Sequence, residues 1–177
     1  MKKNYIFLLL LLSLYACQSK SDKNEKKNVE QIHQEAEIPL DTMGAWVRLV
    51  MLSPQGVLRG FDLGTPLDSI KKNEKATLQE ENKEKKYIAY TFDVDDDFVD
   101  IIYELDEQNK LKAVRVNAVV NGVESFLEDF RKFYELRYGR SKKIDAQNVV
   151  WQSKKGYQIK LSNTKGETKA SIIIEKK

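Results

Sequence analysis

The sequence contains one cysteine and one histidine in 177 residues, and it has no glycine-rich phosphate-binding motif. A single cysteine cannot form a disulfide within the chain. The histidine, His33, lies in a polar N-terminal stretch, so no Ser–His or Cys–His pair is expected in the globular part. Carboxylates are numerous, but the separation that glycoside hydrolysis requires is a spatial property that a sequence does not contain. A Ser–Lys pair also stays open. We nevertheless expect no enzyme activity.

The sequence also lacks an apolar run of the roughly 20 residues that a membrane-spanning helix needs. One shorter run, from Tyr5 to Leu12, follows Lys2 and Lys3 and ends shortly before Ala16. A basic start, a short apolar stretch and a small residue before the cleavage point are typical of a secretory signal peptide. We therefore expect residues 1–16 to be a signal peptide.

The residues Leu14-Tyr15-Ala16-Cys17 resemble the lipobox of bacterial lipoproteins. In that family the cysteine is lipidated, with palmitate among the acyl chains, and becomes the mature N-terminus. The resemblance implies lipidation at Cys17, and two or more acyl chains anchor a protein stably to a membrane. Gln18 after the cysteine resembles outer-membrane sorting in some Gram-negative bacteria. The expected location is thus the cell envelope, at the outer membrane, with the periplasmic or surface-facing side left open.

Charges of the two signs nearly balance along the chain, whose formal net charge is +3. Lys2 and Lys3 belong to the expected signal peptide, so the mature chain is close to neutral. Nucleic-acid binding requires a concentrated basic face, which this composition does not indicate. No motif indicates a cofactor. The expected partners are the membrane, through the N-terminal lipid, and a protein of the cell envelope.

A polar stretch separates the expected lipid anchor from the rest of the chain. From Gln18 to Glu37 the only apolar residues are Val29, Ile32 and Ala36. Such a segment buries too little apolar surface to offset the entropy lost on ordering. We interpret residues 17–37 as a flexible tether and residues 38–177 as a single α+β domain.

Two helices are expected in the domain. In Gly64-Thr65-Pro66-Leu67-Asp68, Thr65 has the properties of an N-cap and Pro66 those of a first helical residue, which predicts a helix to about residue 73. Asn121 is expected to cap a second helix, which ends near Gly139. Its apolar positions follow helical spacing: Val123, Phe126, Leu127, Phe130, Phe133 and Tyr134. Trp46 to Leu52 is too short for its periodicity to separate strand from helix.

Seven segments are expected to be strands. They cover residues 76–81, 86–93, 98–106, 111–120, 146–152, 156–161 and 169–175. Their short polar links favour an antiparallel meander. Helices on one face of such a sheet give an α+β fold with a weak repeat of a helix-plus-meander unit.

This order of elements resembles the β-lactamase-inhibitor-protein-like fold. The stretch Arg59-Gly60-Phe61-Asp62-Leu63-Gly64 before a short helix is also similar to the small outer-membrane assembly lipoproteins of the SmpA/OmlA kind. The resemblance implies a scaffold used for protein contacts, and no catalytic residues follow from it.

An acidic cluster at residues 93–97 is the candidate that most resembles a metal site. Asp93, Asp95, Asp97 and Glu104 match the first, third, fifth and twelfth positions of a Ca²⁺ loop. The sixth position requires glycine, and here it is Phe98. We interpret the cluster as a solvated hairpin tip and expect no metal site, while weak Ca²⁺ binding stays open.

The expected sheet has a second face that is a candidate binding site. Val99, Ile101, Tyr103 and Leu105 share one face of a strand, which leaves Phe98 and Ile102 on the other, together with Tyr87 of the neighbouring strand. Either the segment Trp46–Leu52 covers that face, or it is open and binds a partner. The leading hypothesis is a lipid-anchored envelope lipoprotein that binds a protein partner or supports an assembly. The alternative is a lipoprotein that binds a glycan or peptide.

Overall fold

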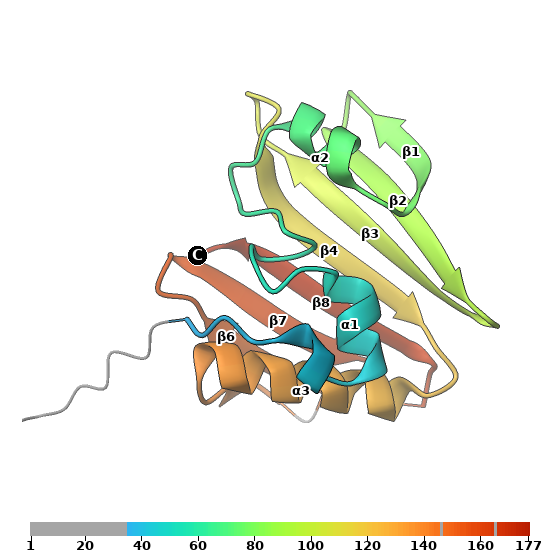
Figure 1. The fold of residues 1–177 in the computed structure, drawn as a ribbon, viewed down its shortest axis with the longest axis vertical. Helices are drawn as coiled ribbons and strands as arrows, with labels where there is room; N and C mark the ends of the chain where they lie inside the picture. The colour runs from blue at the N-terminus through green and yellow to red at the C-terminus, as the bar shows by residue number, and fades with distance from the viewer. Residues whose placement is uncertain (1–34, 146, 165) are drawn as a thin grey trace, which may run out of the picture. The chain divides into compact units, whose positions relative to one another are not determined.

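The computed structural model describes residues 35–145, 147–164 and 166–177 (Figure 1). The expected signal peptide, Cys17, His33 and most of the expected tether lie outside these residues. No helix in the described residues is both long and apolar enough to cross a membrane.

The domain contains an antiparallel sheet of eight strands in the order β1-β2-β3-β4-β8-β7-β6-β5. The strands are β1 Thr77–Asn82, β2 Tyr87–Val94, β3 Asp97–Leu105, β4 Leu111–Val119, β5 Lys142–Lys143, β6 Asn148–Gln152, β7 Tyr157–Asn163 and β8 Lys169–Lys176. Two four-stranded meanders therefore join along β4 and β8. Figure 1 shows these two strands side by side in the middle of the sheet. The expected α+β fold with a meander sheet is confirmed, and the short strand β5 was not anticipated.

The helices lie on one face of this sheet. They are a 3₁₀ turn at Leu40–Thr42 and the helices α1 (Ala45–Met51), α2 (Leu67–Asn73) and α3 (Val123–Tyr138). Helix α3 contacts β6, β7, β8 and α1. Val47, Val50 and Met51 of α1 are buried in the same core. The segment Trp46–Leu52 is thus a helix with a C-terminal cap, and it does not cover the opposite face of the sheet.

Aromatic side chains fill the space between α3 and the sheet. Phe126, Phe130, Phe133 and Tyr134 are fully buried, as their spacing predicts. The ring of Tyr134 lies 5.3 Å from that of Trp151 on β6, within the range of favourable aromatic pairs. Trp151 and Tyr157, whose position in the core or at its rim was open, are both buried.

Both helices predicted from capping residues begin one position later than expected. The N–H of Gly64 donates to the carbonyl of Leu111 at 2.7 Å, and the N–H of Leu111 donates to the carbonyl of Thr65 at 2.8 Å. Pro66, whose backbone is extended, is the N-cap of α2. Before α3, the N–H of Asn121 donates to an Asp97 carboxylate oxygen at 2.7 Å, and Gly122 is the N-cap. In each case the backbone of the expected capping residue forms a hydrogen bond with a distant part of the chain, and the next residue becomes the N-cap.

The alternation of buried and exposed residues along β3 agrees with the sequence. Val99, Ile101 and Tyr103 have no exposed surface and face the helices. Phe98 and Ile102 point to the other face, where Ile102 lies opposite Ala89 of β2 and Arg115 of β4. The register therefore places the three predicted binding residues, Tyr87 included, on the face away from the helices.

Candidate functional site

The sheet face opposite the helices is the candidate site. No helix of the described residues lies over it, and its side chains are mostly half-buried or exposed, in contrast to the helix-covered face. Charged, polar and apolar residues alternate along it, so it presents no continuous aromatic strip. Two separate grooves occur on this open face.

The first groove encloses about 470 Å³ over β2, β3 and β4, and we call it the cationic groove. It contains two of the predicted binding residues, Tyr87 and Ile102, which are half-buried. The full lining consists of Glu80, Lys85, Lys86, Tyr87, Ala89, Ile102, Glu104, Leu105, Lys112 and Arg115. Four cations therefore face two carboxylates.

The two carboxylates of the cationic groove already have partners. Glu104 forms an ion pair with Arg115. The hydroxyl of Tyr87 and the amide of Asn82 hydrogen-bond Glu80 and lower the pKa of its carboxyl. Lys85, Lys86 and Lys112 form no ion pair with any residue that the structure describes. The groove thus carries excess positive charge beside the half-buried side chains of Tyr87 and Ile102.

Phe98, the third predicted binding residue, lies in a different groove of about 480 Å³ that extends from β3 over β4, β8 and β7 to β6. Its side chain is 40% exposed and lies opposite Asp93 and Val119. Asp100 separates it from Ile102 along β3. The three residues share a face, as predicted, but they do not form one patch.

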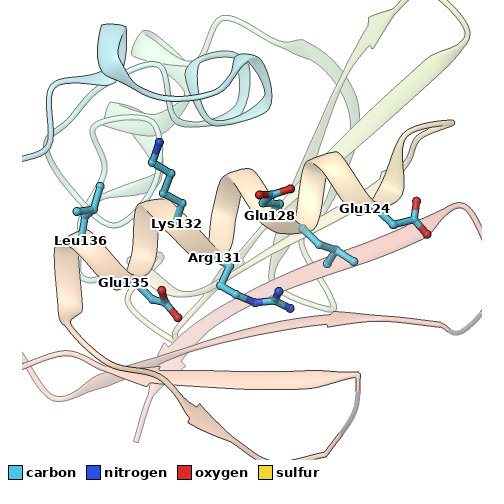
Figure 2. A pocket seen from close by; sticks show the side chains of 7 residues that line it. Glu124, Glu128, Arg131, Lys132, Glu135 and Leu136 are labelled. Carbon is cyan, nitrogen blue, oxygen red and sulfur yellow. The ribbon is translucent and has the colours of Figure 1, made fainter.

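A third hollow follows the solvent side of α3 (Figure 2). Its lining residues all come from this one helix: Glu124, Leu127, Glu128, Arg131, Lys132, Glu135 and Leu136. Figure 2 shows them on successive turns, with acidic and basic side chains interspersed. This is the pattern of a solvated helix face, so no group of convergent side chains forms a site there.

A buried ion pair on the helix-covered face was not anticipated from the sequence. The Glu74 carboxylate accepts hydrogen bonds from Arg59 Nε at 2.9 Å and from the hydroxyl of Tyr103. Burial raises the pKa of Glu74, but hydrogen bonds from Arg59, Tyr103 and Ala76 outweigh it and lower the pKa overall. Burial and the adjacent Glu74 charge raise the pKa of Tyr103. Every group is tied to another protein group, so the network is suited to holding the fold.

A second buried polar cluster surrounds the C-terminal end of α3. Arg137 is 7% exposed, donates to the carbonyl of Gly56 at 2.6 Å and stacks over the rings of Phe133 and Tyr138. The carboxylate of Glu35 accepts hydrogen bonds from Ser153 and, at 3.4 Å, from Tyr157. The end of the expected tether therefore touches the domain.

The acidic cluster forms the tip of the β2–β3 hairpin. Val94 lies opposite Asp97, and Asp95 has a positive φ of 53° in the two-residue turn between them. Asp97 accepts the hydrogen bond from Asn121 described above. Within the described ranges, no group of three or more acidic, histidine or cysteine side chains is placed to hold a metal ion.

Comparisons with known proteins add one finding. No family model and no curated protein matches the chain. Among solved structures, a DUF4309 family protein (YjgB) from Bacillus subtilis is similar over 68% of this chain and 84% of its own, with 7% identity and a TM-score of 0.45. A likeness at this level carries no argument about function.

Sequence reasoning missed the charged half of the cationic groove. Lys112 and Arg115 stand on β4 and Lys85 on the β1–β2 turn, and cross-strand pairing brings them to one groove. Strict alternation along 111–119 would place Lys112 and Arg115 on opposite faces. The register shift between Glu104 and Leu105, where Lys112 is the extra residue of β4, is a tertiary feature that the local pattern does not contain.

Proposed function

We propose that this chain is a lipid-anchored lipoprotein of the cell envelope whose domain binds an acidic segment of a partner protein on its open sheet face. One observation carries the proposal: the cationic groove combines excess positive charge with half-buried Tyr87 and Ile102. Charge complementarity steers association and selects a partner, and the apolar side chains give it a contact to bury.

The groove favours an acidic partner for a physical reason. Arg115 balances the charge of Glu104, whereas Glu80 keeps its negative charge. Lys85, Lys86 and Lys112 outnumber Glu80, so an approaching carboxylate meets a net positive charge. The lysines are at or near the surface, where single ion pairs contribute only about 0.2–1 kcal/mol. We therefore expect a contact that depends on several charges together and weakens as salt rises.

Nothing in the proposal requires catalysis. The buried carboxylate of Glu74 is fully engaged by Arg59 and Tyr103, and so offers no free base. The open face offers charges and hydrogen-bonding groups on a rigid sheet, an arrangement suited to recognition.

Binding of poly-L-glutamate to the full-length protein tests the cationic groove. Lys85→Glu combined with Lys112→Glu should slow association roughly tenfold, because both changes replace attraction by repulsion. Lys154→Glu is the matched control, since Lys154 is an exposed lysine on the β6–β7 turn outside the groove. Equal loss in the control, or binding that salt does not weaken, would reject the groove as the contact.

Cys17→Ser tests the anchor separately. The variant should appear in the soluble fraction, and the wild-type protein should carry acyl mass at its N-terminal cysteine. A variant that still sediments with membranes, together with a wild-type protein free of acyl mass, would disprove the lipoprotein assignment while leaving the groove hypothesis intact.

A further inference from the structure

A row of polar side chains crosses the open face through the second groove. Cross-strand register places Asp100 opposite Asn117, Asn117 opposite Ser171, Ser171 opposite Ser162, and Ser162 opposite Asn148. All five residues line the groove. Because neighbouring strands lie about 4.8 Å apart, the row presents hydrogen-bonding groups over about 19 Å.

Most of these groups have nothing to bond within the domain. The side chains of Asp100, Asn117, Ser162 and Ser171 form no hydrogen bond with residues 35–145, 147–164 or 166–177, whereas the Asn148 amide donates to Asp145 at 2.8 and 2.7 Å. A carboxylate accepts hydrogen bonds, a hydroxyl both donates and accepts them, and a side-chain amide has two N–H donors and one carbonyl acceptor. The row is therefore matched to a ligand rich in groups that both donate and accept.

Apolar surface lies on one side of the row. Phe98 and Val119 are opposite each other on the neighbouring residue pair of β3 and β4 and line the same groove, and Phe98 is 40% exposed. Lys169 lies opposite Val119, and its ammonium is 3.6 Å from the Glu167 carboxylate outside the groove. A groove of about 480 Å³ falls within the range of roughly 300–1,000 Å³ typical of small-molecule sites.

The surroundings exclude two other ligand classes. A peptide that adds as a strand needs a free sheet edge, but β3, β4, β8 and β7 are each paired on both sides. A strongly charged ligand needs a net opposite charge, but the charged groups lining this groove, Asp100 and Lys169, are of opposite sign.

We propose that this polar groove binds a neutral saccharide. A pyranose ring carries several hydroxyls that donate and accept, which fit the row from Asp100 to Ser162. Its apolar C–H face fits an exposed aromatic ring such as Phe98. The inference deepens the glycan alternative from the sequence, and it does not depend on the acidic partner of the cationic groove, whose lining residues are different.

Calorimetric titration of the full-length protein with maltotriose, cellotriose and tri-N-acetylchitotriose tests the inference. We expect at least one trisaccharide to bind, and Asn117→Ala and Phe98→Ala each to weaken it roughly tenfold through a lost hydrogen bond or stacking contact. Gln152→Ala is the matched control, because Gln152 is an exposed amide on the same face outside the groove. This control should bind like the wild-type protein. Unchanged melting temperatures would show that the variants are folded.

Two results would overturn the inference. One is the absence of heat with all three trisaccharides at millimolar concentration. The other is binding that survives both Asn117→Ala and Phe98→Ala, which would locate the sugar elsewhere. Neither result bears on the cationic groove, whose test uses poly-L-glutamate and different residues.

Discussion

The Glu74 carboxylate and the Arg59 guanidinium form an ion pair that is almost completely removed from solvent, with side-chain exposures of 0% and 4% and a closest distance of 2.7 Å. Arg59 also donates to the carbonyls of Leu49 and Val50 near the end of α1, and Glu74 follows the end of α2. Tyr103 joins the pair from β3. The network therefore ties both short helices to the sheet face opposite the candidate site.

Removing one charge of this pair should be costly. Glu74→Gln keeps the shape of the side chain but leaves Arg59 buried without a counter-ion, which typically costs about 3–5 kcal/mol of unfolding free energy. Denaturant unfolding measures it. Lys71→Ala, which breaks the more exposed pair with Glu81, should leave the unfolding midpoint almost unchanged. Equal effects of the two changes would mean that the buried pair is not important for the fold.

Stability should fall in alkali because of three tyrosines. Burial raises the pKa of Tyr103, Tyr134 and Tyr138 above the usual value of 10.0. A group whose pKa is higher in the folded than in the unfolded state stabilises the folded protein. This contribution to the unfolding free energy is complete below the unfolded-state pKa and is lost as the pH rises toward the folded-state pKa. Unfolding should therefore begin above pH 10. Tyrosinate absorbance and circular dichroism should change together for these residues, and ionisation of Tyr103, Tyr134 and Tyr138 in a still-folded protein would contradict their burial.

The aromatic row of α3 should contribute strongly to stability. Phe130→Ala should cost about 3–5 kcal/mol, because its fully buried ring contacts Phe126 and Tyr134 and leaves a cavity when removed. Leu136 on the same helix is 50% exposed, so Leu136→Ala should change the unfolding free energy by less than about 0.5 kcal/mol. A cost below about 1 kcal/mol for Phe130→Ala would contradict the burial of this face of α3, because loss of the transfer free energy of a buried ring alone exceeds that value.

Local patterns were sufficient to predict most of the sheet and the buried face of α3. The alternation of Val99, Ile101 and Tyr103 has one interpretation once a strand is assumed, because successive side chains point to opposite faces. Helix starts were less predictable. Thr65 and Asn121 have the residue types of caps, but hydrogen bonds to Leu111 and Asp97, far away in the sequence, determine where the helices begin.

The grooves could be predicted only in part. Alternation placed Tyr87, Phe98 and Ile102 on one face, and that is confirmed. Which of them lie near each other depends on the register of β2, β3 and β4, which no local pattern contains. For the same reason the row through Asn117 and Ser171 could not be predicted from the sequence. These two residues lie opposite each other because β4 pairs with β8, and α3 and three strands separate β4 from β8 along the chain.

The central claim is that the open sheet face binds the partner, and site-specific photocrosslinking in intact cells tests it most directly. A photoreactive residue at Tyr87 or Ile102 on the open face should capture one envelope protein through an acidic segment. The same photoreactive residue placed at Leu127 or Leu136 of α3, away from the open face, should not capture this envelope protein. The capture should also disappear in the Lys85→Glu, Lys112→Glu background. Capture from Leu127 and Leu136 together with none from Tyr87 and Ile102 would contradict the account.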